Sequence, residues 1–368
     1  MRRSWIPVVM AALLGAAPVW AQDRVVEAPE AQQPIQARPG GPDSAPRTDQ
    51  TVDVARGTRL LLTNGAGEVV VRSWDRDAVR IEASHGSRDT IDVQQADMTL
   101  RVRARSQRSQ ALVDYRLTVP RWMPVNLTGT YLEASIEGTT AEVTVETVHG
   151  NVRVSGGSGN VSARSVAGLI HIEKASGRVQ ATTVNEGIRL VNVSGDITAE
   201  TTNGDIVIEN AQTSNLDAST VNGDITFNGT VRESGSYRMA THGGDLRVGL
   251  GGAANATVFV RTFRGDFEAD FPVQLPEGQA ARSGSKRFNF TLGNGSARIE
   301  LQSFNGDIML ARQRIQSAEE AREERRRQRR PGAMEVPPAP PAPPAPPVAP
   351  APKPPLPPPG GDEPGPKP

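Results

Sequence analysis

The stretch Thr201-Thr-Asn-Gly-Asp-Ile206 recurs 19 residues later as Thr220-Val-Asn-Gly-Asp-Ile225. Related steps can be followed through most of the chain, each with a hydroxyl residue four positions before the Asp position. Successive hydroxyls are 18 to 21 residues apart. They are Thr147, Ser165, Thr183, Thr201, Thr220, Thr241, Thr262, Ser283 and Ser303.

Two apolar columns keep step with these hydroxyls. The first is Val152, Ile170, Ile188, Ile206, Ile225, Leu246, Phe267, Phe288 and Ile308. The second is Val154, Ile172, Leu190, Ile208, Phe227, Val248, Ala269, Phe290 and Leu310. A similar pair occurs earlier in each period, as at Val179 and Ala181. A period near 20 that holds polar and apolar positions together predicts an all-β parallel β-solenoid of 18–21 residues and two strands per coil.

The hydroxyl, Asn and Gly positions read as the corner of each coil. We expect Asn and Gly to supply positive φ angles. The hydroxyls should point inward and bond to backbone groups and to the hydroxyl of the next coil. The predicted structural turn residues are Thr201, Asn203, Gly204, Thr220, Asn222, Gly223, Thr241, Gly244, Thr262, Gly265 and Gly306.

The Asp column is the sharpest chemical candidate. Carboxylates stacked about 4.8 Å apart could bind Ca²⁺, and the candidate ligands are Asp205, Asp224, Asp245 and Asp266. A carbohydrate-active β-helix enzyme could use the same column, through Asp224 and Asp245. The column also contains Asn151 and Leu169, however, and the coils have almost no long loops to wall a cleft. We therefore favour solvated turn carboxylates, with no cofactor and no catalytic residue.

The N-terminus predicts export. Residues 1–21 have the charged start, short apolar core and small-residue cleavage site of a signal peptide. No segment approaches the 18 apolar residues of a transmembrane helix. Residues 22–48 read as a flexible linker, and the solenoid domain should occupy 49–310. Cysteine is absent, which rules out disulfides and thiolate chemistry.

The sequence changes character at both ends of the repeat. Residues 50–128 contain less regular strands and should cap one end of the stack, because an open parallel edge invites aggregation. Residues 311–330 predict a charged Arg/Glu-rich helix, which Pro331 and Gly332 end. It could be a solvated helix, an end cap or an electrostatic attachment to an anionic envelope surface. Residues 331–368 read as a disordered Pro-rich tail.

Charge and aromatic content narrow the choice of partners. The formal net charge is +0, with 26 Lys and Arg against 30 Asp and Glu in residues 48–308. Aromatic residues make up only 4% of the chain. Neither a nucleic-acid footprint nor an aromatic platform for bases or sugars is indicated. The four histidines show no metal-ligand spacing.

The order of these features resembles a bacterial "putative-adhesin" domain family of unknown function, built from β-strand repeats. The resemblance rests on the strand pair from Leu60 to Val71, the following Ser73-Trp74-Asp75, the strand Tyr115–Pro120 and the Gly-Asp turns through Ile308. It covers residues 50–310 and implies no catalytic residues.

We therefore expect an exported, non-enzymatic scaffold in the periplasm, on the outer-membrane surface or in the medium. Its partner would be an unknown envelope or extracellular ligand, either protein or glycan. Outward-facing residues such as Thr198, Glu200 and Val207 would present a flat binding surface.

Overall fold

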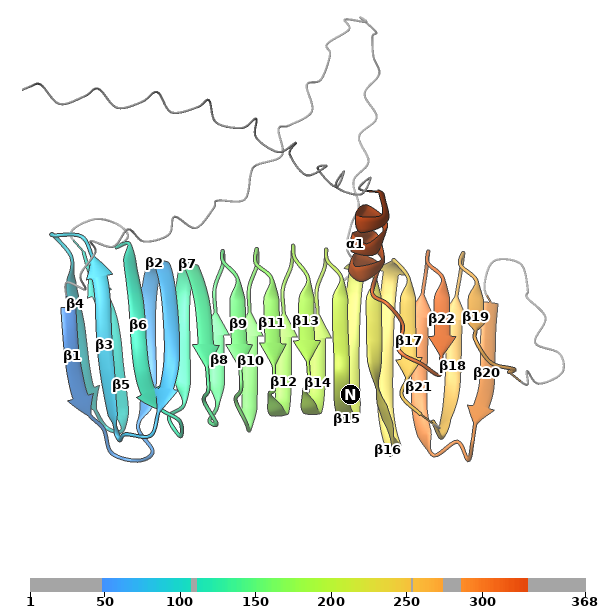
Figure 1. Ribbon diagram of the computed structural model, residues 1–368, viewed down its shortest axis with the longest axis horizontal. Coiled ribbons are helices and arrows are strands. Elements are labelled where there is room, and N and C mark those ends of the chain that lie inside the picture. The colour runs from blue at the N-terminus through green and yellow to red at the C-terminus, as the bar shows by residue number, and fades with distance from the viewer. Residues whose placement is uncertain (1–47, 107–110, 253, 274–285, 330–368) are drawn as a thin grey trace, which may run out of the picture. The chain divides into compact units, whose positions relative to one another are not determined.

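The computed structural model describes residues 48–106, 111–252, 254–273 and 286–329, with side chains through residue 324. Within these ranges, 22 strands form one continuous coiled sheet, and a single short helix follows them (Figure 1). The predicted all-β parallel solenoid is confirmed. The predicted signal peptide, the linker up to residue 47 and the Pro-rich tail lie outside the described residues. No helix in the described part of the chain is both long and apolar enough to cross a membrane.

The N-terminal end of the stack is closed by antiparallel pairs. β1 is antiparallel to β3, β3 is antiparallel to β6, and β4 is antiparallel to β5. The first long strand, β2 (Arg59–Trp74), instead runs parallel to β5, β6 and β7 (Val125–Glu137) and so begins the coil pattern. This agrees with the expected cap within residues 50–128. The closing strands are β1 (Thr48–Asp53), β3 (Ala78–His85), β4 (Thr90–Ala96), β5 (Thr99–Arg105) and β6 (Val113–Pro120).

The central coils repeat in exact parallel register. In the first half of the coils, Val161 pairs with Val143 and Val179. In the second half, Ile170 pairs with Val152 and Ile188. In β15 (Ile206–Asn222) and β16 (Ile225–Gly243) the strand continues through a corner of the coil. The shorter strands are β8 (Val143–Glu146), β9 (Val152–Ser155), β10 (Asn160–Arg164), β11 (Ile170–Glu173), β12 (Ser176–Thr182), β13 (Ile188–Val191) and β14 (Ser194–Glu200).

The core lies between the two halves of each coil. Large β-branched residues such as Ile188 and Ile206 are fully buried on one half. Small residues such as Ala181 and Ala199 fill the second column of the other half. Each buried Val or Ile contributes about 1.5–3 kcal/mol relative to an exposed one. The pairing of large with small residues explains why the two apolar column pairs differ in composition.

The stacking order departs from the chain order at the C-terminal end. β21 pairs in parallel with both β16 and β18, and β22 with both β17 and β19. The last coil in sequence is therefore inserted between two earlier ones. The strands concerned are β17 (Leu246–Leu250), β18 (Ala256–Thr262), β19 (Phe267–Ala269), β21 (Ala297–Ser303) and β22 (Ile308–Ala311).

One expected coil is absent from this end. Phe288 and Phe290 were expected in the second-half columns, but β20 (Lys286–Leu292) runs antiparallel to β18, with Phe290 opposite Val258. That placement in the columns is wrong. An alternating pattern has period two in either strand direction, so residue spacing cannot reveal the reversal. The hydroxyl assigned to that coil, Ser283, lies outside the described residues.

The C-terminal helix is shorter than residues 311–330. α1 spans Ala318–Arg329, and Ser317 caps it: the Glu320 amide donates to Ser317 Oγ at 3.2 Å, and the Ser317 amide donates to Glu320 Oε2 at 3.0 Å. Residues 312–317, the strap, connect β22 to α1 and contact the solenoid. Asn228 anchors the strap by donating to the Ile315 carbonyl and accepting from the Ile315 amide, both at 2.9 Å.

Candidate functional site

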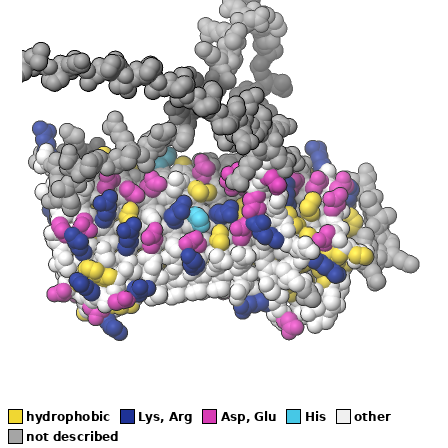
Figure 2. Space-filling view, viewed as in Figure 1, with side chains coloured by type: hydrophobic (Ala, Val, Ile, Leu, Met, Phe, Trp, Pro, Cys, Tyr) yellow, Lys and Arg dark blue, Asp and Glu magenta, His cyan; other side chains and the backbone are white. Residues whose placement is uncertain are grey.

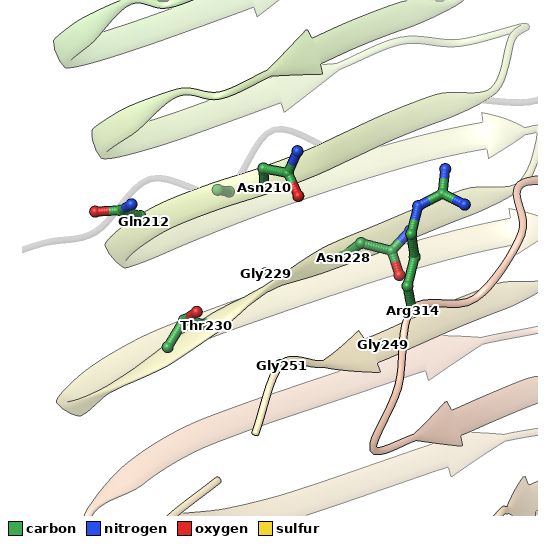
Figure 3. A pocket seen from close by; sticks show the side chains of 9 residues that line it. Asn210, Gln212, Asn228, Gly229, Thr230, Gly249, Gly251 and Arg314 are labelled. Atoms are coloured by element: carbon green, nitrogen blue, oxygen red, sulfur yellow. The ribbon is translucent and has the colours of Figure 1, made fainter. Parts of the chain in front are cut away.

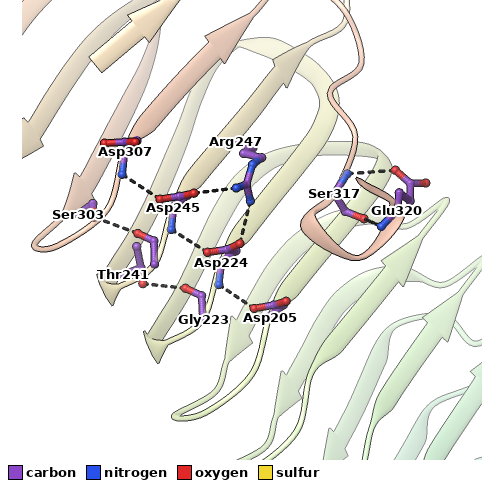
Figure 4. A network of polar contacts seen from close by, with 11 residues as sticks. Asp205, Gly223, Asp224, Thr241, Asp245, Arg247, Ser303, Asp307, Ser317 and Glu320 are labelled. Atoms are coloured by element: carbon purple, nitrogen blue, oxygen red, sulfur yellow. Dashed lines mark hydrogen bonds and ion pairs between the residues drawn. The ribbon is translucent and has the colours of Figure 1, made fainter. Parts of the chain in front are cut away.

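The repeated turns line one edge of the solenoid, which we call the turn edge. In stacking order its turns are residues 147–151, 165–169, 183–187, 201–205, 220–224, 241–245, 303–307 and 262–266. All the predicted turn residues and all four candidate calcium ligands lie here. Figure 4 shows part of this edge.

The hydroxyl column forms a continuous ladder. Thr220 Oγ1 donates to the Gly204 carbonyl at 3.1 Å and so satisfies a backbone acceptor of the preceding coil, whereas Thr147 Oγ1 donates within its own turn to the His149 carbonyl at 3.0 Å. The expected bond between neighbouring hydroxyls is replaced by this bond to the backbone. Equivalent bonds of 2.9–3.4 Å join Ser165 to Gly150, Thr183 to Gly168, Thr201 to Glu186, Thr241 to Gly223, Ser303 to Gly244 and Thr262 to Gly306.

The glycine column exists for a different reason from the expected one. Neither Asn203 and Asn222 nor the predicted turn glycines have positive φ. A Cβ added to Gly223 would instead lie 2.0 Å from the Gly204 carbonyl oxygen, which is far inside van der Waals contact. The same clash, at 1.8–2.2 Å, would arise at Gly204, Gly244, Gly265 and Gly306. Glycine is required because stacked turns bring backbones together.

Positive φ angles recur instead at a different corner of the coils. Lys174, Asn192 and Asn210 follow the second-half strands at intervals of 18 residues, with φ of 55°, 55° and 53°. The prediction of positive φ at the Asn-Gly turns is therefore wrong. That conformation belongs to the corner between the second-half strand of one coil and the first-half strand of the next.

The Asp column is a second ladder (Figure 4). The Asp224 amide donates to Asp205 Oδ1, and the Asp245 amide donates to Asp224 Oδ1, both at 2.8 Å. The Asp307 amide continues the series onto Asp245 at 3.0 Å, and the Asp266 amide onto Asp307 at 2.8 Å. Each carboxylate therefore accepts a hydrogen bond from the backbone of the next coil.

Three of the other carboxylate oxygens in this column form ion pairs. Arg247 bridges two coils by donating to Asp224 Oδ2 at 2.8 Å and to Asp245 Oδ2 at 2.7 Å. Lys286 pairs with Asp266. Among the described residues, no group of three or more His, Cys, Asp or Glu is placed to hold a metal ion. In this geometry the candidate calcium ligands, and the pair Asp224 and Asp245 of the enzyme alternative, act as hydrogen-bond acceptors that join coils.

The Asn position forms a third, shorter ladder. Asn203 Nδ2 donates to Asn185 Oδ1 at 3.3 Å, and Asn222 Nδ2 donates to Asn203 Oδ1 at 2.9 Å. These side-chain bonds run along the stack outside the backbone ladder. They explain the Asn preference in successive coils without any left-handed conformation.

Between the hydroxyl and Asn columns lies a row of exposed side chains, which we call the edge row. Its members in stacking order are Val148, Val166, Val184, Thr202, Val221, His242, Phe304 and Phe263. The six large apolar side chains of the edge row are 36–44% exposed. They account for six of the eleven large apolar side chains exposed in the described part of the chain. Such concentration along one line is typical of an interaction surface.

Aromatic rings extend the edge row at its C-terminal end. His242 stacks on Phe304 with ring centroids 4.6 Å apart, and Phe304 stacks on Phe263 at 4.8 Å. The ring planes lie within 6° of one another. Phe304 is therefore covered on both faces, and His242 and Phe263 are each covered on one face.

The edge row was missed from the sequence, although a signal was present. The position after each hydroxyl reads Val, Val, Val, Thr, Val, His, Phe and Phe in stacking order. In a strand, an apolar residue next to an inward hydroxyl would have to point outward. The more regular Gly and Asp positions of the turns obscured this pattern.

The expected flat surface is only partly available. Glu200 is exposed and Thr198 half-buried, but Val207 is 5% exposed. Val207 lines a cavity of about 670 Å³ together with Glu319 and Arg322 of α1. Figure 2 shows basic and acidic side chains interspersed over the visible face, without a large area of one sign. The predicted attachment to an anionic surface concerns residues 311–330, and the side chains from residue 325 onward lie outside the described residues.

A smaller cavity of about 270 Å³ lies beside the strap (Figure 3). Its polar lining is already occupied with structural contacts. Asn228 bonds to Ile315 through both amide atoms, and Arg314 donates to Glu209 at 2.7 Å and to Glu320 at 2.6 Å. Glu209 also accepts from Arg189 at 3.1 Å. We interpret this cavity as the place where the strap packs against the solenoid.

In the second-half strands, His171 of β11 lies in register between Arg153 of β9 and Arg189 of β13. Burial lowers the pKa of His171 below its ordinary value, and Arg153 adds to the effect, whereas Glu173 opposes it. The imidazole is therefore kept neutral among cations.

The chain is similar to one protein family and to solved structures. A family model described as Toastrack DUF4097 matches residues 58–311. A solved structure described as "a putative adhesin" from Bacteroides fragilis is similar at 13% identity and a TM-score of 0.32, over 72% of this chain and 96% of that one. Another, "a putative cell adhesion protein" from Clostridium sporogenes, is similar at 11% identity and a TM-score of 0.17, over 73% and 99%. No curated protein matches.

Proposed function

Because the chain belongs to the Toastrack DUF4097 family, we propose that it is an exported, non-enzymatic β-solenoid that acts as an adhesin-like interaction scaffold in the cell envelope or at its surface. The edge row carries this proposal. It places exposed apolar side chains in one line on turns that three ladders of hydrogen bonds hold in place. A rigid surface loses little conformational entropy when it binds.

The chemistry of the row favours a polypeptide partner over a glycan. Sugar rings bind aromatic side chains through the ring faces, and stacking covers both faces of Phe304 and one face each of His242 and Phe263. Valine side chains and ring edges suit the apolar side chains of an extended protein segment. The ligand that we propose is therefore an envelope or extracellular protein.

Export and binding can be tested separately. Cell fractionation should find the chain, cleaved near residue 21, in the periplasm, the outer membrane or the medium. An uncleaved protein confined to the cytosol would contradict export. For binding, a photo-crosslinking residue would replace Val184 or Val221 in living cells, with exposed Asp217 on a strand face as the matched control.

We expect a discrete protein adduct from positions 184 and 221 and none from position 217. The adduct formed from position 184 should be lost when Val221→Asp is added, because the charge would lie in the contact. No adduct from the row, or equal adducts from all three positions, would overturn the scaffold proposal.

A further inference from the structure

We propose that the Pro-rich C-terminal tail of this chain, residues 331–368, docks along the edge row. The inference goes beyond the proposed function, because it concerns a contact within the chain. The occupant is a segment of the same molecule. The argument combines where the described chain ends, the repeat within the tail and the spacing of the row.

The helix that precedes the tail, α1, begins beside the middle of the edge row. Glu319 and Arg322 of α1 line one cavity together with Asn185 and Asn203 of the turn edge. These asparagines directly follow Val184 and Thr202 of the row. A 12-residue helix is about 18 Å long. The tail therefore starts within a short distance of the central turns.

The tail sequence has the repeat of a polyproline II helix. Residues 337–347 read Pro-Pro-Ala three times and then Pro-Pro. Because this helix has three residues per turn, Ala339, Ala342 and Ala345 would fall on one side and prolines on the other two. Proline-rich segments of this kind bind apolar and aromatic surfaces, and their stiffness reduces the entropy lost on binding.

The pitch of such a helix matches the spacing of the edge row. One polyproline II turn rises about 9.3 Å, and two coils of the solenoid rise about 9.6 Å. Each Pro-Pro-Ala unit would therefore meet an equivalent pair of row side chains. The eleven residues 337–347 span about 34 Å, as do the seven steps between the eight members of the row.

Tethering makes even weak binding effective. The 38 residues of the tail reach about 120 Å when extended, so they can lie along the whole row. A short tether gives an effective concentration on the order of 1 mM. With a dissociation constant of about 0.1 mM, the row would be covered about 90% of the time.

The absence of cysteine allows a direct test by thiol accessibility. Single cysteines would replace Thr202 or Val221 in the row, with Asp217→Cys as the control. Alkylation rates would be compared among the full chain, a chain ending at residue 330 and a full-length chain whose tail prolines from 337 to 359 are changed to serine. We expect alkylation at 202 and 221 to be about tenfold slower in the full chain than in the other two. The rate at 217 should not change.

Equal rates in all three chains would overturn the inference. So would protection that appears at 100 µM protein and vanishes at 1 µM, because a second copy would then cover the row. The outcome separates this inference from the proposed function. Protected thiols without crosslinked partners in cells would leave only the tail docking, whereas row-specific adducts without thiol protection would leave only the scaffold.

Discussion

The backbone amide of Asp266 donates a hydrogen bond to the Asp307 carboxylate at 2.8 Å, although Asp307 comes 41 residues later in the chain. The Asp307 amide in turn donates to Asp245 at 3.0 Å. The coil that contains β21 and β22 is therefore an inner layer of the stack. The earlier coil of β18 and β19 lies outside it and is closed by antiparallel β20.

This order predicts that the last coil supports the one before it. A chain that ends at residue 296 would lose β21 and β22, and β18 and β19 would lose their parallel partners. We expect residues 254–273 of this chain to become rapidly digested by protease, while the coils up to β14 remain resistant. A chain ending at residue 330 is the control. Equal resistance of residues 254–273 in both chains would contradict the inserted order.

The close approach of stacked turns makes Gly306→Ala destabilising. The new Cβ would lie 1.8 Å from the Gly244 carbonyl oxygen, so the backbone of one turn must move. We expect a loss of about 1–3 kcal/mol in the free energy of unfolding. Gly251→Ala is the matched control, because its Cβ would meet its nearest atom at an ordinary 3.4 Å. Equal denaturation midpoints for the two variants would argue against this origin of the glycine column.

The hydroxyl ladder predicts a cost for Thr220→Val. Valine keeps the shape of the side chain but leaves the Gly204 carbonyl without the 3.1 Å bond from Thr220. We expect a loss of about 1–3 kcal/mol in chemical denaturation, since a buried acceptor becomes unsatisfied. Thr198→Val, on a half-buried strand position, should change stability by less than about 0.5 kcal/mol. If both substitutions are neutral, the ladder does not contribute to stability.

Calcium should have no effect on the stability of the solenoid. Both oxygens of Asp224 and of Asp245 already accept hydrogen bonds from Arg247 or from the backbone of the next coil. Thermal melting of the full chain in millimolar Ca²⁺ and in EDTA should give the same midpoint. A clear rise of the melting midpoint in Ca²⁺ that is lost in Asp224→Asn would support a calcium-binding module instead.

Docking of α1 should weaken in acid. Burial raises the pKa of Glu320, but the hydrogen bonds from Arg314 and from the Ser317 amide outweigh it, so the pKa lies below its ordinary value of 4.5. A lowered pKa in the folded state stabilises the contact above the unfolded value, and that contribution is lost as the pH falls through the folded value. Hydrogen exchange of the α1 amides, corrected for intrinsic rates, should therefore rise below about pH 4.5. In Glu320→Gln it should be already raised at pH 6 and nearly independent of pH.

Much of the fold could be predicted from local pattern. The hydroxyl at Thr220 and the apolar residue at Ile225 recur with their counterparts at each coil, which gives both the period and the inward positions. The cap near β3 and β6 and the helix at α1 also followed from strand and helix signals. The roles of the turn residues did not follow. Gly223 is a turn residue by any pattern, but only its neighbour in the preceding coil, Gly204, shows that space and not φ selects glycine.

The sequence by itself determined that equivalent residues stack, because each coil must bury its apolar columns against its neighbours. Which coil lies beside which was decided only by the tertiary structure. The columns at Thr241, Ser303 and Thr262 have nearly the same chemistry, so they fit in any order until backbone pairing selects one. The edge row is decided in the same way. Row members that are neighbours in the stack are 18 to 62 positions apart in the chain, and they become one surface only when the turns are stacked.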